Sequence, residues 1–543
     1  MSARIIPRCT CRQQRSLLAA TTGLNPGQQR RWASSSADVK GKRRQRSGWQ
    51  PGTQSSMHSI IREADKHLHA VIGLELHVQL KGNVKLLSPA KAVYDSTPNS
   101  SVATFDAALP GSLPQLGAEP VRLALLACLA LKSNINPRSS FDRKHYFYPD
   151  LPAGYQVTQK YCTTVDQCII NHKFDVKDTA KSSHDPETGT TLVDLNRAGA
   201  ALIEIVTRPD MKSSVQAAAF VRHLQAILRH VGASDANMEK GELRCDVNVS
   251  VQRVGSSESG TRCEIKNMNG VRFLAAAIES EIDRQITELE AGKQIEQATR
   301  GFNAVTGQTY HLRGKEDAPD YRFMPDPELG AIIVTKERLK KMRDELPELP
   351  DEAFDRLRKQ YGLAAREASI LVALGERLDD DRDQGESLAG VGVKYFEDVA
   401  RGRDAQVAAN WVIHELLGAL SKAELTLAAS PVTPQALGSL IDAVATNKLT
   451  GTTAKALVRS FIANPQGPSF SELISQSISS QPTSSDLDLI CPQVINDLAT
   501  ESDKVRRGHS KVLMRLVGEV MKRTGGKANA QKAKQVLQDL LQS

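Results

Sequence analysis

The sequence predicts a mixed α+β domain followed by helical domains, and two observations support this prediction. Up to about residue 347, short segments of alternating apolar and polar residues, the pattern of half-buried strands, lie between amphipathic helical segments. Beyond Pro347–Pro350 the alternation disappears, and helical periodicity dominates in the ranges 352–376, 404–422, 434–446 and 452–463. A chain of 543 residues is long enough for about two to four domains.

The N-terminal segment is much more basic than the rest of the chain. Residues 1–61 hold eleven Lys and Arg residues against the single acid Asp38, so their net positive charge is larger than the net charge of +8 of the whole chain. An Arg- and Ser-rich, acid-poor N-terminus is typical of a mitochondrial transit peptide, although a basic arm that holds RNA would have the same composition. We expect residues 1–62 to form this leader and a flexible linker. No apolar run reaches the ~20 residues that a membrane span requires, so no membrane span is expected.

The first predicted strand runs from Leu68 to Leu80. Its alternation places Glu75 and His77 on one face and apolar residues on the other. Side chains two residues apart on one strand face are about 7 Å apart. A polar face on an edge strand would show the same pattern. An apolar helix is predicted next, at Val121–Leu131, and a substrate-facing loop at Tyr146–Gln159.

The stretch Val193–Asp210 contains a strand with a buried carboxylate. Residues 198–206 are apolar except for Gly199 and Glu204, as expected of a strand in a core. Burying a carboxylate costs several kcal/mol unless a cation or hydrogen-bond donors meet it. Glu204 is therefore either part of a core ion pair, for example with Arg197 or Arg208, or a metal ligand.

Two further strands form a predicted hairpin between two predicted helices, Ser213–Gly232 and Val271–Lys293. The alternation of both strands leaves a polar face with Arg244 and Asp246 on the first strand and Arg262, Glu264 and Lys266 on the second. Carboxylates and bases on one sheet suit Mg²⁺-ATP chemistry, because hard oxygen ligands hold Mg²⁺ and cations neutralise phosphate charge. A solvated sheet face with cross-strand ion pairs is the alternative.

Several stretches, in this order, resemble the B subunit of the tRNA-dependent amidotransferases (GatB). They are GLELHVQL (73–80), YFYPDLPAGYQVTQ (146–159), DLNRAG…LIEIV…PD (194–210), SDANMEKGELRCDVNVSV (234–251), RCEIKNMN (262–269), YRFMPDPEL (321–329) and LVGEVMKRTGGKAN (516–529). Together they span nearly everything after about residue 70.

The resemblance implies an α+β catalytic cradle, a sheet with helices related in fold to glutamine synthetase, over residues 63–345. A helical domain over 346–468 and a linker with a basic helical tail over 469–543 follow. The linker is expected in the Ser-rich stretch Ser469–Asp486. Residues 503–543 carry ten Lys and Arg against three acids. Such a patch could contact the backbone of tRNA, or be no more than a soluble face.

The resemblance also implies an activity, that of an ATP-dependent carbon–nitrogen ligase with glutamine as amido donor, in the mitochondrial matrix. ATP activates the side-chain carboxylate of Glu-tRNA(Gln) as an acyl phosphate, and ammonia converts it to Gln-tRNA(Gln). The implied partners are tRNA(Gln), an amidase (A-type) subunit that supplies the ammonia, and a small C-type subunit. A non-catalytic tRNA-binding scaffold is one alternative. A free-standing glutamine-synthetase-like ligase is another, but it leaves the basic tail unexplained.

The cofactors implied are ATP and Mg²⁺. The resemblance assigns Mg²⁺ and phosphate to Glu75, His77, Glu204 and Asp246, with Glu264 and Lys266 nearby and Arg244 and Arg262 on the nucleotide. The segment KFDVKDTAK (173–181) departs from the family pattern, because Lys177 stands where relatives have a ligand glutamate. We hypothesise that Asp175 or a water takes this place. Bacterial relatives carry a zinc cluster in the segment that matches Ser88–Leu113, which has no cysteine here, so no zinc is expected.

Overall fold

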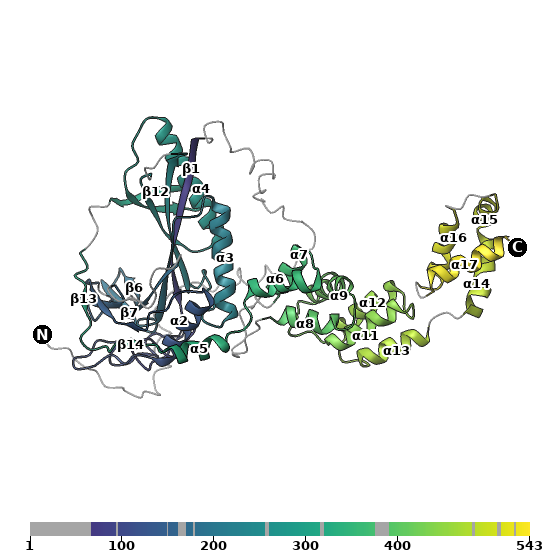
Figure 1. Ribbon diagram of the computed structural model, residues 1–543, viewed down its shortest axis with the longest axis horizontal. Helices are drawn as coiled ribbons and strands as arrows, with labels where there is room; N and C mark the ends of the chain where they lie inside the picture. Colours follow the sequence, from purple (N-terminus) through teal and green to yellow (C-terminus); the bar gives the residue numbers. More distant parts are fainter. Residues whose placement is uncertain are drawn as a thin grey trace, which may run out of the picture. The chain divides into compact units, whose positions relative to one another are not determined.

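A computed structural model gives the fold of the chain (Figure 1). It describes residues 67–542 except 94–95, 149, 161–169, 177–179, 256–259, 315–319, 375–389, 481–483, 508–511 and 526–527. The expected leader, residues 1–62, lies outside the described residues.

The α+β part is built on one large sheet. In the described part of the chain, ten strands pair in the order β12-β11-β10-β9-β1-β8-β5-β4-β3-β13. All neighbours are antiparallel except β10 and β11, which are parallel. The strands of this sheet are β1 (Leu68–Gln79), β3 (Asp142–His145), β4 (Tyr155–Thr158), β5 (Ile170–Val176), β8 (Ala201–Thr207), β9 (Leu243–Arg253), β10 (Cys263–Met268), β11 (Ala298–Asn303), β12 (Gln308–Gly314) and β13 (Met324–Pro325). Two small sheets pair β2 (Arg138–Ser139) with β14 (Ile332–Ile333) and β6 (Lys181–Asp185) with β7 (Thr190–Asp194).

The core lies on one face of this sheet. The apolar residues of β1 that alternate with Glu75 and His77, from Ile72 to Val78, are fully buried. They share one hydrophobic cluster with side chains of α2 (Ala118–Ala130), α3 (Ser214–His230) and α4 (Val271–Glu290). A shorter helix, α5 (Lys336–Asp344), adds Met342 to this cluster. Since apolar residues occupy one face, the alternation turns the polar residues to the other face.

The strands and helices predicted around the site are confirmed. β1, β8 and the β9–β10 hairpin fall where alternation predicted them, and α2, α3 and α4 match the three predicted helices within a few residues. The Ser213 hydroxyl accepts a hydrogen bond from the Gln216 backbone N–H, which explains where α3 begins. The predicted loop 146–159 is correct only in its first part, because its end forms β4.

A buried ion pair fastens the segment after β1 to the start of β8. Lys85 Nζ lies 2.8 Å from the carboxylate of Asp106, and both side chains are almost fully buried. The same ammonium group donates to the carbonyls of Ser101 and Leu195, and Asn196 accepts from the backbone of Ser101. These contacts tie the polar residues that precede β8 to a long irregular segment.

Gly199 is required at this junction for two reasons. Its φ of +84° is in the left-handed region, which favours glycine. A Cβ there would also lie only 3.3 Å from Asp106 Oδ1 and 3.4 Å from Lys85 Cδ. The glycine therefore lets the chain approach the ion pair and turn into β8.

The rest of the chain is helical, as predicted. A second hydrophobic cluster joins α6 (Pro350–Tyr361), α7 (Ala365–Ala373), α8 (Val391–Ala400), α9 (Ala405–Asn410), the π-helix η2 (Trp411–Leu416), α10 (Leu417–Lys422), α11 (Pro434–Ala445), α12 (Gly451–Ala463) and α13 (Phe470–Ser479). A third cluster joins α14 (Ser484–Asp497), α15 (Ala499–Arg506), α16 (Leu513–Arg523) and α17 (Ala530–Gln542). No helix in the described part of the chain is long and apolar enough to span a bilayer.

Two predictions for the helical part are wrong in detail. The single helix predicted over 352–376 is broken after Tyr361, because Gly362 adopts a left-handed φ of +67° and ends α6. The Ser-rich stretch Ser469–Asp486 is not only a linker, since it contains α13. Ser469 and Glu472 form a capping box, and the buried Phe470 and Ile474 pack this helix into the second cluster.

We predict that Lys85→Met destabilises the protein by about 3–5 kcal/mol, because it leaves the buried Asp106 carboxylate without its cation. The double variant Lys85→Met/Asp106→Leu should recover part of this loss, since it removes both charges. Lys81→Met is the matched control. Lys81 pairs with Asp235 at 3.0 Å, but both side chains are about half exposed, so the loss should be below about 1 kcal/mol. Urea unfolding of the three variants measures the difference, and equal losses for Lys85→Met and Lys81→Met would contradict it.

Candidate functional site

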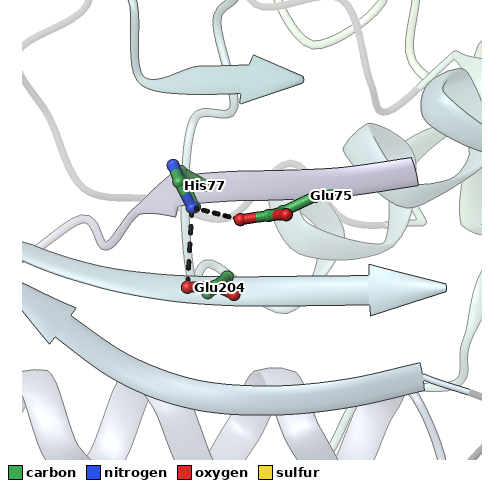
Figure 2. A group of neighbouring side chains, drawn as sticks. All are labelled: Glu75, His77 and Glu204. Carbon is green, nitrogen blue, oxygen red and sulfur yellow. Dashed lines mark ion pairs between the residues drawn. The ribbon is translucent and has the colours of Figure 1, made fainter. Parts of the chain in front are cut away.

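The centre of the sheet brings Glu75, His77 and Glu204 together on its polar face (Figure 2). The β1–β8 register places His77 directly opposite Glu204, and Glu75 is one pleat repeat along β1. His77 Nε2 lies 3.5 Å from Glu75 Oε1 and 3.6 Å from Glu204 Oε2. Glu204 is 8% exposed, whereas the side chains of Glu75 and His77 are about one-third exposed. The cluster therefore has a buried floor and an accessible rim.

This cluster has the dimensions of a divalent cation site. The three ligand atoms lie within 4.8 Å of one another. Two atoms that each lie 2.0–2.1 Å from one Mg²⁺ ion can be at most about 4.2 Å apart, and both nitrogen–oxygen separations of His77 are shorter than this. Two carboxylates and an imidazole can thus hold one cation after small side-chain movements.

β9 brings two more of the predicted residues beside the cluster. Its register places Asp246 opposite Glu75 and Arg244 opposite His77. A Cβ on Gly241 would lie about 4 Å from the guanidinium groups of both Arg244 and Arg197, so both groups lie close to the start of β9. Arg208, the other arginine considered as an ion-pair partner of Glu204, is exposed. Sequence reasoning named Arg197 only as an ion-pair partner and did not connect it with Arg244.

Lys266 lies between two carboxylates of the polar face. Its Nζ is 3.3 Å from Asp246 Oδ2 and 3.2 Å from Glu264 Oε1. The β9–β10 register shifts between Ile265 and Met268, and the backbone N–H of Asn267 donates to Asp246 Oδ1. Burial by itself lowers the pKa of Lys266, but the charges of Asp246 and Glu264 outweigh it, so the pKa lies above its usual value. Lys266 is therefore a fixed positive charge beside the cluster.

Lys177, which stands where the family has a ligand glutamate, lies outside the described residues. The first part of the segment 173–181 belongs to β5, which ends at Val176, and its backbone register places Lys173 opposite Glu204 and Asp175 opposite Leu202. The suggestion that Asp175 supplies a ligand stays a prediction.

The outer end of the polar face has residues that sequence reasoning missed. β11 and β12 form a hairpin in which Thr299 pairs with Arg313, and Thr299 also pairs with Glu264 of β10. Arg262 and Glu264, both predicted for the site, line a cavity with these two residues. The one signal in the sequence is weak: two short segments, 298–303 and 308–314, are separated by a turn that contains Gly307.

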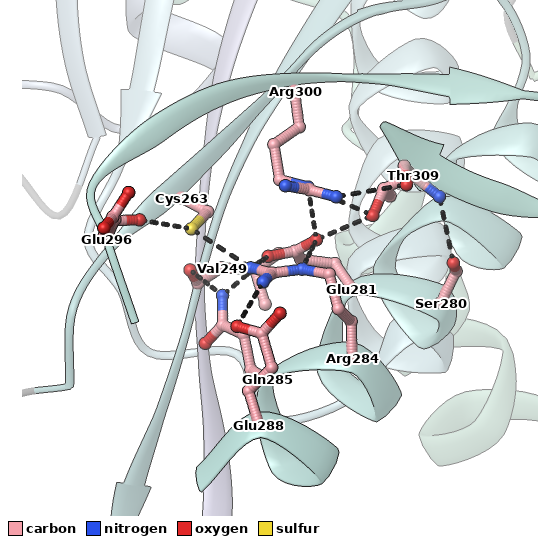
Figure 3. A network of polar contacts seen from close by, with 10 residues as sticks. All are labelled: Val249, Cys263, Ser280, Glu281, Arg284, Gln285, Glu288, Glu296, Arg300 and Thr309. Atoms are coloured by element: carbon pink, nitrogen blue, oxygen red, sulfur yellow. Dashed lines mark hydrogen bonds and ion pairs between the residues drawn. The ribbon is translucent and has the colours of Figure 1, made fainter. Parts of the chain in front are cut away.

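A buried network on the opposite face fixes this hairpin to α4 (Figure 3). The fully buried Glu281 pairs with Arg284 at 2.6 Å and Arg300 at 3.0 Å and accepts a hydrogen bond of 2.8 Å from Thr309. Burial raises the pKa of Glu281, but the hydrogen bonds from Arg284, Gln285 and Thr309 outweigh it, so the pKa lies below its usual value. An ionised Glu281 therefore connects α4 with β11 and β12.

The described cysteines do not contribute a nucleophile. All four are buried. Burial raises the pKa of Cys128 to about 12 and that of Cys245, on the core face of β9, well above its usual value. A thiol with a raised pKa remains protonated and unreactive at neutral pH. The chemistry available on this sheet is that of carboxylates, an imidazole and fixed cations.

Comparisons with known proteins show which proteins the chain is similar to. The family profile described as the GatB/GatE catalytic domain matches residues 70–340, which include the whole polar face, and the profile described as the GatB domain matches residues 394–541. The B subunit of the mitochondrial glutamyl-tRNA(Gln) amidotransferase of Cryptococcus neoformans is 44% identical to the chain, over 88% of the chain and 94% of that protein.

Two further relatives have similar coverage. The protein of the same name from Mycosarcoma maydis is 40% identical, over 87% of the chain and 86% of its own length. The B subunit of the aspartyl/glutamyl-tRNA(Asn/Gln) amidotransferase of Bartonella tribocorum is 42% identical, over 85% of the chain and 93% of its own length.

We predict that Glu281→Gln destabilises the protein by about 3 kcal/mol at pH 7, because the largely buried Arg300 loses its counter-charge and Arg284 keeps only Glu288. Since the pKa of Glu281 is lowered in the folded state, this stabilisation is present above the unfolded value of about 4.3 and is lost as pH falls through the folded pKa. The difference between the free energies of unfolding of variant and parent should therefore become smaller as the pH is lowered from 7 to 3. Glu290→Gln, at an exposed position of the same helix, is the control and should change little. A gap that does not narrow at low pH would show that charge is not the cause.

Proposed function

The chain belongs to the GatB family, the B subunits of the tRNA-dependent amidotransferases, and we propose that it forms Gln-tRNA(Gln) from Glu-tRNA(Gln) in mitochondria. The names of the fungal relatives support both the substrate and the compartment. In this proposal the subunit is the ATP-dependent part of a carbon–nitrogen ligase whose amido donor is glutamine, and it works in the matrix.

The observation that carries this proposal is the Glu75–His77–Glu204 cluster with the fixed cation Lys266 beside it. A carboxylate does not react with ammonia until one of its oxygens becomes a good leaving group. The side-chain carboxylate of the glutamyl group attacks the γ-phosphorus of ATP, and ADP leaves. Ammonia then attacks the acyl carbon, the bond to the phosphate oxygen breaks, and phosphate and a proton are released.

Glu75, His77 and Glu204 would hold Mg²⁺, with Asp246 at its side. When bound, Mg²⁺ offsets the negative charge on the phosphate oxygens. Both oxygens of Asp246 already accept from Lys266 and Asn267. We therefore propose that the main role of Asp246 is to orient Lys266. Asp246 would contact the metal directly only if Lys266 turned away from it toward the phosphate.

The cations of the polar face bind the nucleotide in this proposal. Lys266, with its raised pKa, keeps its proton and neutralises charge on the transferred phosphoryl group. Arg244, exposed and opposite His77, lies where it can reach the phosphates of ATP. Arg262 lies further along the face, beside Glu264.

The ammonia has to come from another subunit. We propose an amidase (A-type) subunit as its source, and a small C-type subunit as a further partner. The basic C-terminal helices, with ten Lys and Arg against three acids over residues 503–543, would contact the backbone of tRNA(Gln).

A tRNA-binding scaffold without catalysis is the second candidate function. Lys177 favours it, because a cation in the place of a ligand glutamate would repel a metal ion. The two candidates differ in one respect only, whether the polar face turns over ATP.

We predict that Glu204→Gln in the purified complex lowers Glu-tRNA-dependent phosphate release from [γ-³²P]ATP at least about 100-fold, because the floor of the cation site loses its charge. The affinity for Mn²⁺, used as a probe of the site, should fall by about 10- to 100-fold. The affinity for Glu-tRNA(Gln) should stay within about twofold, since Glu204 is buried.

Glu239→Gln, an exposed carboxylate on the loop before β9, is the matched control and should behave as the parent. If the parent complex binds Glu-tRNA(Gln) but releases no phosphate with ammonia present, the scaffold function is correct. Phosphate release that needs no tRNA would instead indicate a free-standing ligase.

A further inference from the structure

A cavity of about 150 Å³ lies at the outer end of the polar face, between β10, β11 and β12. Its polar lining comes from Arg262, Glu264, Gln297, Thr299 and Arg313. The β-sheet register explains this grouping, because Glu264 pairs with Thr299 and Thr299 pairs with Arg313 across three neighbouring strands. Directly paired residues project from the same face of a sheet.

The charge of this cavity is positive. Its only carboxylate in the described lining, that of Glu264, already pairs with Lys266 at 3.2 Å and accepts from the Thr299 hydroxyl at 3.3 Å. Arg262 and Arg313 are exposed, and neither guanidinium makes an ion pair or hydrogen bond within the described part of the chain. Two guanidinium groups without counter-charge at one cavity suit a phosphate, which accepts paired hydrogen bonds from each.

The cavity is connected to the cation cluster but separate from it. Thr299, Glu264, Lys266 and Asp246 form a continuous line of contacts, and Asp246 lies opposite Glu75. β11 is three strands from β1 in the sheet order, which corresponds to about 14 Å at the usual strand spacing. One phosphate cannot occupy both places, so the cavity would bind a different phosphate from the one that reacts.

Contacts on the core face of the sheet stabilise the hairpin that carries Arg313. Arg300 and Thr309, on the same two strands as Thr299 and Arg313, are anchored to Glu281 of α4 on the core face (Figure 3). The hairpin therefore holds its polar side chains on a rigid support, which reduces the entropy lost when a ligand binds.

We propose that Arg262 and Arg313 form a second phosphate subsite that holds a non-reacting phosphate of the substrate. This inference rests on the proposed function, because ATP and tRNA are the phosphate-bearing substrates of that reaction. The phosphate comes either from the nucleotide or from the RNA backbone near the aminoacylated end, and in both cases the recognition chemistry is the same.

The test is Arg313→Ala in the purified complex, with Arg253→Ala as the matched control. Arg253 is exposed on β9, and the alternation of that strand places it on the face opposite Asp246. The dissociation constants of Mg²⁺-ATP and of Glu-tRNA(Gln) are measured separately by calorimetry and filter binding. We expect an increase of about 10-fold or more for one of the two ligands, from the loss of a charge-assisted contact. Arg313→Lys should recover part of it, and the melting temperature should not change.

The two sources of the phosphate give different results. A weaker affinity for Mg²⁺-ATP alone assigns the subsite to the nucleotide. A weaker affinity for Glu-tRNA(Gln) assigns the subsite to the RNA, and the affinity should then depend less steeply on salt concentration, by the amount expected for about one lost phosphate contact. If Arg313→Ala and Arg253→Ala both bind the two ligands as the parent does, the proposal is wrong. Since these are binding constants, they decide the question even if the parent complex turns over no ATP.

Discussion

The structure depends on one buried carboxylate opposite a histidine at the centre of a sheet. Glu204 of β8 is 8% exposed, and His77 of β1 faces it across the strand pair. A carboxylate with so little water needs positive or donating groups around it. His77 Nε2 lies 3.6 Å from this carboxylate, and the strand order places β9, with Arg244 and Asp246, on the other side of β1. The buried carboxylate is thus part of the group of side chains that could hold a cation.

Two buried polar groups hold this arrangement in place from different directions. The Lys85–Asp106 pair fastens the segment that precedes β8, so that the strand begins at a defined residue. Glu281 does the same for the β11–β12 hairpin at the outer end. Neither group lies on the polar face itself. They act through the backbone, by fixing the strands whose alternate residues form that face.

Local pattern was enough to predict many of the residues on the polar face. Period-two alternation placed Glu75 with His77 and Arg244 with Asp246, because side chains of a strand alternate between its faces whatever the partners are. It failed at Thr299 and Arg313, since β11 and β12 are short, polar and partly exposed, and have no strong apolar alternation. It failed also at α13, where a serine-rich composition concealed a capping box and two core residues.

The faces of the strands, the order of the helices and the family of the chain can be read from the sequence alone. These follow from local periodicity and from stretches of residues that can be compared without coordinates. The folded chain is needed to see which strands are neighbours. It shows that Glu204 faces His77, that Lys266 lies between Asp246 and Glu264, and that Arg313 and Arg262 line one cavity. The physical reason is that strand pairing joins residues of separate segments, which for His77 and Glu204 lie more than a hundred positions apart. Its register is set by the burial of the apolar face as a whole, and no single segment contains that information.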